Sequence, residues 1–268
     1  MGKRGQVTLF VILGIVIVVL VALFLIGRKT IFMPVTTESL EGEMESIKEA
    51  IISCGYDNSL NSPNSLLQAI GKQGGYLETP EGTYILYADN KISYLCYNIP
   101  DKESCSNRML TLKNMEDQLN ENVGYFMDSC LNEIKNTGNL KSYNIIVQDK
   151  PNYQFVIRPD SVVLNVNWLV TLKGKSKDIS VSEDKFEVMF DYPLGNLYDV
   201  SQEVINGWDV FSGEAVSGNF DTLTYMLAKK GEYKLYLKKP YPDKVYTITK
   251  EGNEYIFQFA IQGENRFA

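Results

Sequence analysis

The chain has 268 residues, no histidine and a formal net charge of −7 at pH 7. The missing histidine excludes Ser-His-Asp and Cys-His nucleophile arrangements, histidine-containing zinc motifs and the commonest general base. Residues 30–268 hold all 33 acidic side chains and 22 of the 26 basic ones, which leaves this part with a net charge of −11. Nucleic acid and an anionic membrane surface are therefore poor partners for it.

An uncharged apolar stretch runs from Val7 to Ile26. As a helix it would be about 30 Å long, which matches the hydrocarbon core of a bilayer. A cleaved secretory signal has an apolar core of only about 7 to 15 residues and a small-residue cleavage site, whereas this stretch ends before Arg28 and Lys29. We therefore predict that residues 6–27 form a retained transmembrane helix, with the bilayer as partner of residues 7–26.

The residues before this stretch, Lys3-Arg4-Gly5-Gln6, resemble the class III signal peptide of archaeal type IV pilin-like proteins. The resemblance implies that a prepilin-type peptidase removes a basic leader, residues 1–5, by cutting between Gly5 and Gln6. Many members carry Glu at the fifth mature position, where it helps subunits register in a filament, but this chain has Phe10. The resemblance thus supports processing more than polymerisation, and an ordinary uncleaved anchor with a basic flank is the alternative.

The orientation of the anchor does not follow from its flanks, because two basic residues precede the stretch and two follow it. All four cysteines lie beyond the stretch, and an even number of cysteines there suits an oxidising exterior. We therefore predict a single-pass protein of the cell membrane whose C-terminal head is extracellular.

After a linker, residues 28–36, in which Pro34 ends any continuing helix, we predict a helical and mixed segment over residues 37–140. Apolar residues recur there every three or four positions in three stretches, which predicts helices over 37–54, 63–71 and 107–136. Between the last two, a glycine-rich turn at 71–76 leads to short strands at 83–87 and 91–97.

The four cysteines allow three pairings, and the sequence leaves the choice open. We favour Cys54 with Cys130, because Cys54 ends one predicted helix and Cys130 lies on the apolar stripe of another. Cys96 with Cys105 would then close a short loop. Metal binding would need Cys-x-x-Cys spacing or histidine, and the chain has neither, so we predict no metal and no cofactor.

Residues 141–268 are predicted to be rich in antiparallel sheet. Alternating patterns predict strands over 144–148, 153–157, 161–172, 178–192, 233–237, 244–250 and 254–261, with helices over 197–208 and 220–228. In 161–172 one face is wholly apolar and the other mixed, which indicates a sheet half covered by another layer. The predicted fold class is α+β, with a transmembrane helix followed by an extracytoplasmic head.

Three features of the sequence bear on a possible catalytic or binding site. Ser182 and Lys185 match a Ser-x-x-Lys nucleophile motif, but that motif needs a helical turn and these residues fall in a predicted strand. Lysines mixed with tyrosines over 229–246 indicate a solvated strand face, with an anionic glycan or a partner protein as the alternative ligand. A carboxylate pair, as in glycoside hydrolysis, stays open because nothing marks out one pair. No catalytic residue is predicted.

The predicted function is that of a non-enzymatic, surface-exposed structural or interaction protein, either a pilin-like subunit or an adhesion or envelope component. Other pilin-like or envelope proteins would be its partners, and a prepilin-type peptidase would process it. The alternative is a monomeric membrane-tethered binding module for a peptide, glycan or solute. A membrane-tethered hydrolase that uses two carboxylates is the third hypothesis.

Overall fold

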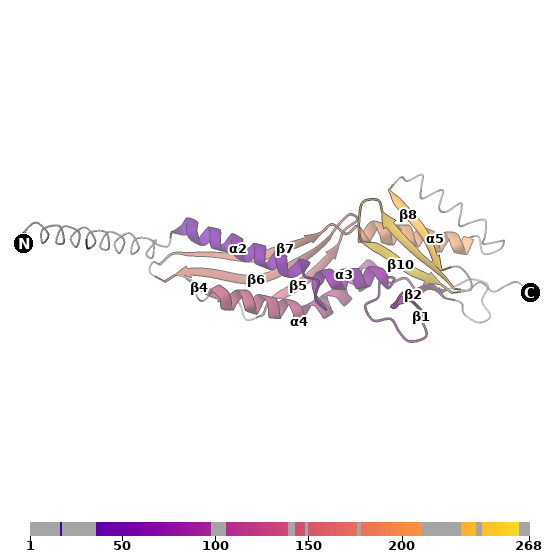
Figure 1. Cartoon of the computed structure of the whole chain (residues 1–268), viewed down its shortest axis with the longest axis horizontal. Coiled ribbons are helices and arrows are strands. Elements are labelled where there is room, and N and C mark those ends of the chain that lie inside the picture. Colours follow the sequence, from indigo (N-terminus) through magenta and orange to yellow (C-terminus); the bar gives the residue numbers. More distant parts are fainter. Residues whose placement is uncertain are drawn as a thin grey trace, which may run out of the picture.

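The computed structural model describes residues 17, 36–97, 106–138, 143–147, 150–175, 178–210, 232–239 and 243–262. Within them the fold is α+β, with four helices and two sheets, as predicted (Figure 1). No helix in these ranges is both long and apolar enough to cross a membrane. The predicted leader, the predicted transmembrane helix apart from Ile17, and the predicted helix at 220–228 lie outside the described residues.

The four helices are α2 (Thr37–Tyr56), α3 (Pro63–Lys72), α4 (Leu112–Gly138) and α5 (Leu194–Val210). The strands of the first half are β1 (Tyr84–Tyr87), β2 (Asn90–Tyr97), β3 (Ser106–Asn107), β4 (Tyr143–Val147) and β5 (Asn152–Ile157). Those of the second half are β6 (Val162–Gly174), β7 (Ser180–Phe190), β8 (Tyr233–Lys239), β9 (Lys244–Lys250) and β10 (Ile256–Ile261).

The first sheet, which we call the antiparallel sheet, consists of β4 to β7. The long strand β6 is its centre: β7 pairs along one side, while β4 and β5 lie end to end along the other. Helices α2 and α4 pack on one face, α2 over β7 and β6 and α4 over β5 and β4 (Figure 1). The predicted apolar face of β6 is buried under them: Val162, Leu164, Val166, Trp168, Val170 and Leu172.

Helix α2 begins with a capping box. The Thr36 hydroxyl accepts a hydrogen bond from the Ser39 amide (3.2 Å), and the Ser39 hydroxyl accepts one from the Thr36 amide (3.0 Å). The helix runs two residues beyond the predicted end at Cys54. Its apolar stripe is buried against the sheet, as the three-four spacing predicted: Leu40, Met44, Ile47, Ile51 and Cys54.

Helix α4 starts later than predicted, so the expected start at residue 107 is wrong. Ser106 and Asn107 instead form β3 and pair with the end of β2. The helix begins after Thr111, whose hydroxyl accepts a hydrogen bond from the Asn114 amide (3.2 Å). Met109 fits the helical spacing of apolar residues, which is why the sequence predicted a helix there. The backbone just before it pairs with β2 instead, and this tertiary pairing overrides the local helical preference.

Side chains of α4 also cover the free edge of β5. The Phe155 amide donates to the Asn120 side chain (2.7 Å), and the Ile157 amide donates to the Glu116 carboxylate (2.8 Å). A sheet edge with unpaired backbone groups is a template for association with other chains. These two contacts remove two such donors from β5.

The second sheet, which we call the mixed sheet, has the order β1-β2-β10-β9-β8, with β3 beside β2. Its pairs are antiparallel except β2 with β10, which are parallel. Helices α3 and α5 pack against its central strands. Because β2 pairs with β10, the last of the described strands, the predicted segments 37–140 and 141–268 share one sheet and one hydrophobic core.

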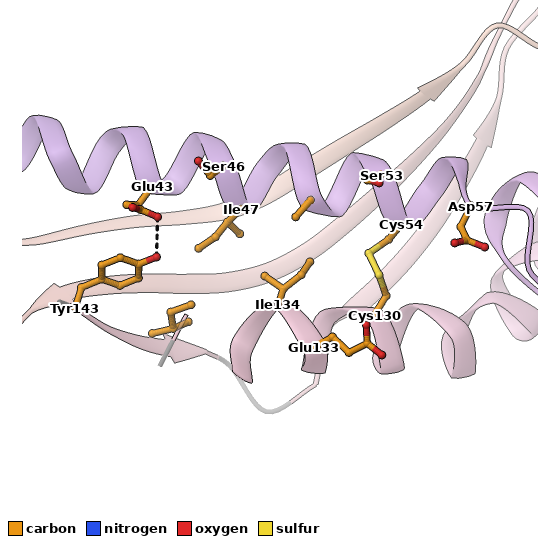
Figure 2. A pocket seen from close by; sticks show the side chains of 12 residues that line it. Glu43, Ser46, Ile47, Ser53, Cys54, Asp57, Cys130, Glu133, Ile134 and Tyr143 are labelled. Carbon is orange, nitrogen blue, oxygen red and sulfur yellow. Dashed lines mark hydrogen bonds between the residues drawn. A yellow bond between two sulfur atoms is a disulfide. The ribbon is translucent and has the colours of Figure 1, made fainter. Parts of the chain in front are cut away.

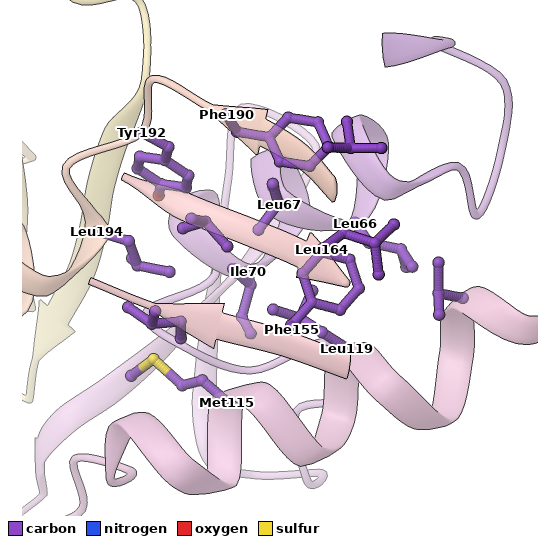
Figure 3. Close-up of a cluster of buried hydrophobic side chains, with 14 of the residues drawn as sticks. Leu66, Leu67, Ile70, Met115, Leu119, Phe155, Leu164, Phe190, Tyr192 and Leu194 are labelled. Atoms are coloured by element: carbon purple, nitrogen blue, oxygen red, sulfur yellow. The ribbon is translucent and has the colours of Figure 1, made fainter. Parts of the chain in front are cut away.

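Helix α3 lies where the two sheets meet. Leu67 and Ile70 of this helix are fully buried among side chains from α4, β5 and the end of β7 (Figure 3). Next to them the hydroxyl of the buried Tyr192 donates to the Ile256 carbonyl (3.0 Å). A Cβ at Gly71 would overlap both of these groups, so only glycine fits there without a shift of the backbone.

Candidate functional site

An open groove of about 370 Å³ lies between α2 and the C-terminal turns of α4, above β4 (Figure 2). Its volume falls within the range of about 300 to 1,000 Å³ that is typical of ligand sites. The apolar part of its lining comes from three elements: Ile47, Ala50, Ile134 and Ile145, together with the disulfide.

The disulfide between Cys54 and Cys130 lies near one end of this groove and ties α2 to α4, which confirms the predicted pairing. The two Cα atoms are 6.2 Å apart, within the usual range for a disulfide. Cys96 is also disulfide-bonded. Its predicted partner, Cys105, lies outside the described residues.

Carboxylates surround the apolar floor. Glu43 lies at one end, where its carboxylate accepts a hydrogen bond from the Tyr143 hydroxyl (2.8 Å), and Glu133 lies on α4 near Cys130, toward the other end (Figure 2). Asp57, which follows α2, borders the groove beyond the disulfide. Hydrogen bonds from the hydroxyl and the amide of Ser59 lower the pKa of Asp57, so this carboxyl is charged at neutral pH.

The two helices that form the walls are themselves acidic. Helix α2 carries five acidic side chains and one lysine, and α4 carries five acidic side chains and two lysines. Lys48 and Lys113 pair with carboxylates of their own helices. The groove is therefore an apolar depression in a strongly negative surface.

The mixed sheet is the second candidate site, because lysine and tyrosine side chains lie next to one another on it. Lys91 lies over the ring of Tyr84 (4.9 Å), and Lys238 lies over the ring of Tyr236 (4.8 Å). Other lysines of this sheet pair with acidic side chains: Lys234 with Glu251 (2.9 Å) and Lys250 with Asp160 (3.0 Å). Much of the basic charge of these strands is thus balanced by neighbouring groups of the same chain.

The Ser-x-x-Lys match does not form a site. Ser182 lies in β7, where its hydroxyl is 2.9 Å from the Thr171 hydroxyl in an exposed cross-strand pair, and Lys185 lies opposite Asn167. Among the described residues, no cluster of three or more metal-ligating side chains could hold a metal ion. The predicted processing residues Gly5 and Gln6 lie outside the described residues.

The groove could not be recognised in the sequence. The position of Cys130 on the apolar stripe predicted contact between the two helices, but nothing marked Glu43 and Glu133 among the 33 acidic residues. That both residues line one groove depends on the antiparallel course of α2 and α4 over the sheet (Figure 1). The enrichment of acids in both predicted helices was the one available signal.

No protein-family model matches the chain, and it matches neither a curated protein nor a solved structure. The function is therefore inferred from the residues and geometry of this chain.

Proposed function

We propose that the protein is a membrane-anchored, surface-exposed interaction protein, either a pilin-like subunit or an adhesion or envelope component. The observation that carries this proposal is the acid-rimmed groove on a disulfide-bonded head that follows an apolar N-terminal stretch. Helix α2 begins only a short linker after Ile26, so the end of the head that bears the groove follows directly on the anchor.

Two further features support an exterior head. Disulfides persist in oxidising surroundings, and Cys54 with Cys130 is such a bond. The resemblance of residues 3–6 to a class III signal peptide supports export and processing by a prepilin-type peptidase.

The acidic surface of α2 and α4 favours contacts with cationic protein surfaces over contacts with nucleic acid.

Labelling of intact native cells tests the proposal. A membrane-impermeant amine reagent should modify Lys48 and Lys113, whose side chains are 47% and 66% exposed, before the cells are opened. Mass spectrometry of the recovered protein locates the label. If these lysines react only after lysis, the head is not on the surface and the proposed function is wrong.

A monomeric membrane-tethered binding module is the second candidate, and the size of the groove favours it. Cross-linking on intact cells, combined with electron microscopy of the cell surface, separates the two. A pilin-like subunit should yield ladders of cross-linked copies and surface filaments, whereas a binding module should yield one protein with a different partner. Nothing among the described residues favours a carboxylate-based hydrolase.

A further inference from the structure

We infer that the groove between α2 and α4 binds a cationic segment of a partner protein, in which an apolar side chain is flanked by Lys or Arg. This inference rests on the proposed function, since it assumes an interaction protein and names the chemistry of its partner. The occupant follows from the floor of the groove, from its rim and from the rigidity of its walls.

The floor selects an apolar side chain. Its apolar lining consists of Ile47 and Ala50 of α2, Ile134 of α4 and Ile145 of β4. A volume of about 370 Å³ accommodates a few side chains rather than a whole helix. Binding energy in protein interfaces concentrates in such central apolar pockets that a partner side chain fills and desolvates.

The rim selects positive charge around that side chain. Glu43 and Glu133 border the groove from opposite helices, and Asp57 borders it beyond the disulfide. Complementary charge at an interface rim steers association and rejects partners of the wrong sign. Lys and Arg also suit the place because their aliphatic stems can lie along the apolar lining while the charged ends reach the carboxylates.

The walls are fixed before anything binds. The disulfide sets the distance between α2 and α4 near one end of the groove, and the Tyr143 hydroxyl bond to Glu43 joins α2 to β4 at the other. A preformed site loses less conformational entropy on binding than a mobile one. A short peptide should therefore bind measurably without further contacts elsewhere on the head.

The test uses the full chain in nanodiscs of zwitterionic lipid and the fluorescein-labelled peptide KKLIKK, followed by fluorescence anisotropy. Saturable binding is expected, and empty nanodiscs correct for binding to lipid. The matched peptide EELIEE should not bind, because its charges repel the rim. The peptide KKSSKK should bind at least about tenfold more weakly, since it lacks the apolar anchor.

Paired variants locate the binding site. Glu43→Gln with Glu133→Gln removes two rim charges and should weaken KKLIKK about fivefold. Glu41→Gln with Glu121→Gln removes the same charge from exposed positions of the same two helices that do not line the groove, and should leave the affinity nearly unchanged. Ala50→Trp should fill the groove and abolish binding, with circular dichroism as the check that it folds.

Three results would overturn the inference: no binding of KKLIKK, equal binding of EELIEE, or equal weakening by both double variants. The last would show attraction to the acidic helices in general and not to the groove. Failure of the proposed function is recognised separately, because an interior head would prevent labelling of intact cells without changing peptide binding in nanodiscs.

Discussion

The antiparallel sheet and the mixed sheet bury their residues in different ways. In β6 of the antiparallel sheet, buried residues alternate with half-buried or exposed ones from Leu164 onward, since helices cover only one face. In the mixed sheet, the middle of β9 and β10 is buried on both faces, including the polar side chains of Thr247 and Gln258, which bond to each other (2.8 Å). The antiparallel sheet is covered by helices on one face only, whereas the central strands of the mixed sheet are buried on both faces.

This difference assigns separate tasks to the two regions. The antiparallel sheet supports α2 and α4. These helices are rich in acidic side chains and form the walls of the groove. The mixed sheet joins β2 to β10 and so fastens the end of the described chain to its first half. Changes at the rim of the groove should affect binding, whereas changes in the buried mixed sheet should affect the cohesion of the whole head.

The largest expected effect comes from the disulfide that holds the groove. Cys54→Ser with Cys130→Ser should lower the free energy of unfolding by about 4 kcal/mol, because the bond closes a loop of 76 residues in the unfolded chain. Urea unfolding of the full chain in detergent measures this loss. If the loss is under about 1 kcal/mol, the bond does not constrain the unfolded chain as assumed.

The second largest effect is expected at Gly71 of α3, at the place where the two sheets meet, which we call the junction. Gly71→Ala should cost about 3 kcal/mol, because the new methyl group would overlap the Tyr192 hydroxyl and the Ile256 carbonyl. Gly42→Ala, also within a helix but with open space around it, should instead stabilise the protein by about 0.5 to 1 kcal/mol. Thermal unfolding compares the two variants. Equal effects would show that α3 is not tightly packed at the junction.

A smaller effect is expected at the edge of the antiparallel sheet. Asn120→Ala should cost about 1 to 2 kcal/mol, because it removes the acceptor of the Phe155 amide. Hydrogen exchange at this amide should become faster. Asn132→Ala, at an exposed position of the same helix, is the control and should change neither quantity by much. Unchanged exchange at Phe155 in Asn120→Ala would mean that the helix does not protect the edge.

The smallest effect is a pH dependence at the junction. Burial, helped by the nearby Glu254 carboxylate, raises the pKa of Tyr255 to about 12, above its ordinary value of 10.0. Burial also raises the pKa of Tyr192, which stacks on Tyr255 at 4.3 Å. The folded state therefore holds these protons more tightly than the unfolded chain. The resulting stability is complete below pH 10 and is lost as the pH rises toward 12.

Urea midpoints at pH 9, 10 and 11 measure this slope. Tyr255→Phe should make the decline with pH shallower, because one of the raised tyrosine pKa values is gone. Tyr125→Phe, at a side chain that is 86% exposed, should keep the slope of the parent protein. A decline that is equally steep in Tyr255→Phe would place the alkaline sensitivity elsewhere.

The antiparallel sheet was predicted well from the sequence, because the patterns that define its strands lie within short, consecutive stretches of the chain. Strands β4 to β7 follow one another along the chain, turn residues separate them, and the alternation in β6 marks its buried face. The pairing of Cys54 with Cys130 was predictable for a related reason. Both cysteines lie on helical faces that the three-four spacing identifies.

The mixed sheet and the groove could not be predicted in the same way. The parallel pairing of Tyr94 with Ala260 joins residues that are far apart in the sequence, and no local pattern encodes that choice. The two-residue strand β3 is too short to have a period. The groove depends on how α2, α4 and β4 come together, which is a matter of tertiary packing.

The N-terminal mass of the protein recovered from its native membrane tests the central claim most directly. A membrane-anchored, pilin-like surface protein should begin at Gln6 and retain the apolar stretch from Val7 to Ile26. A protein that begins at Met1 or Gly2 would contradict processing by a prepilin-type peptidase and leave only a permanent anchor. A protein that begins beyond Ile26 would contradict the membrane anchor itself.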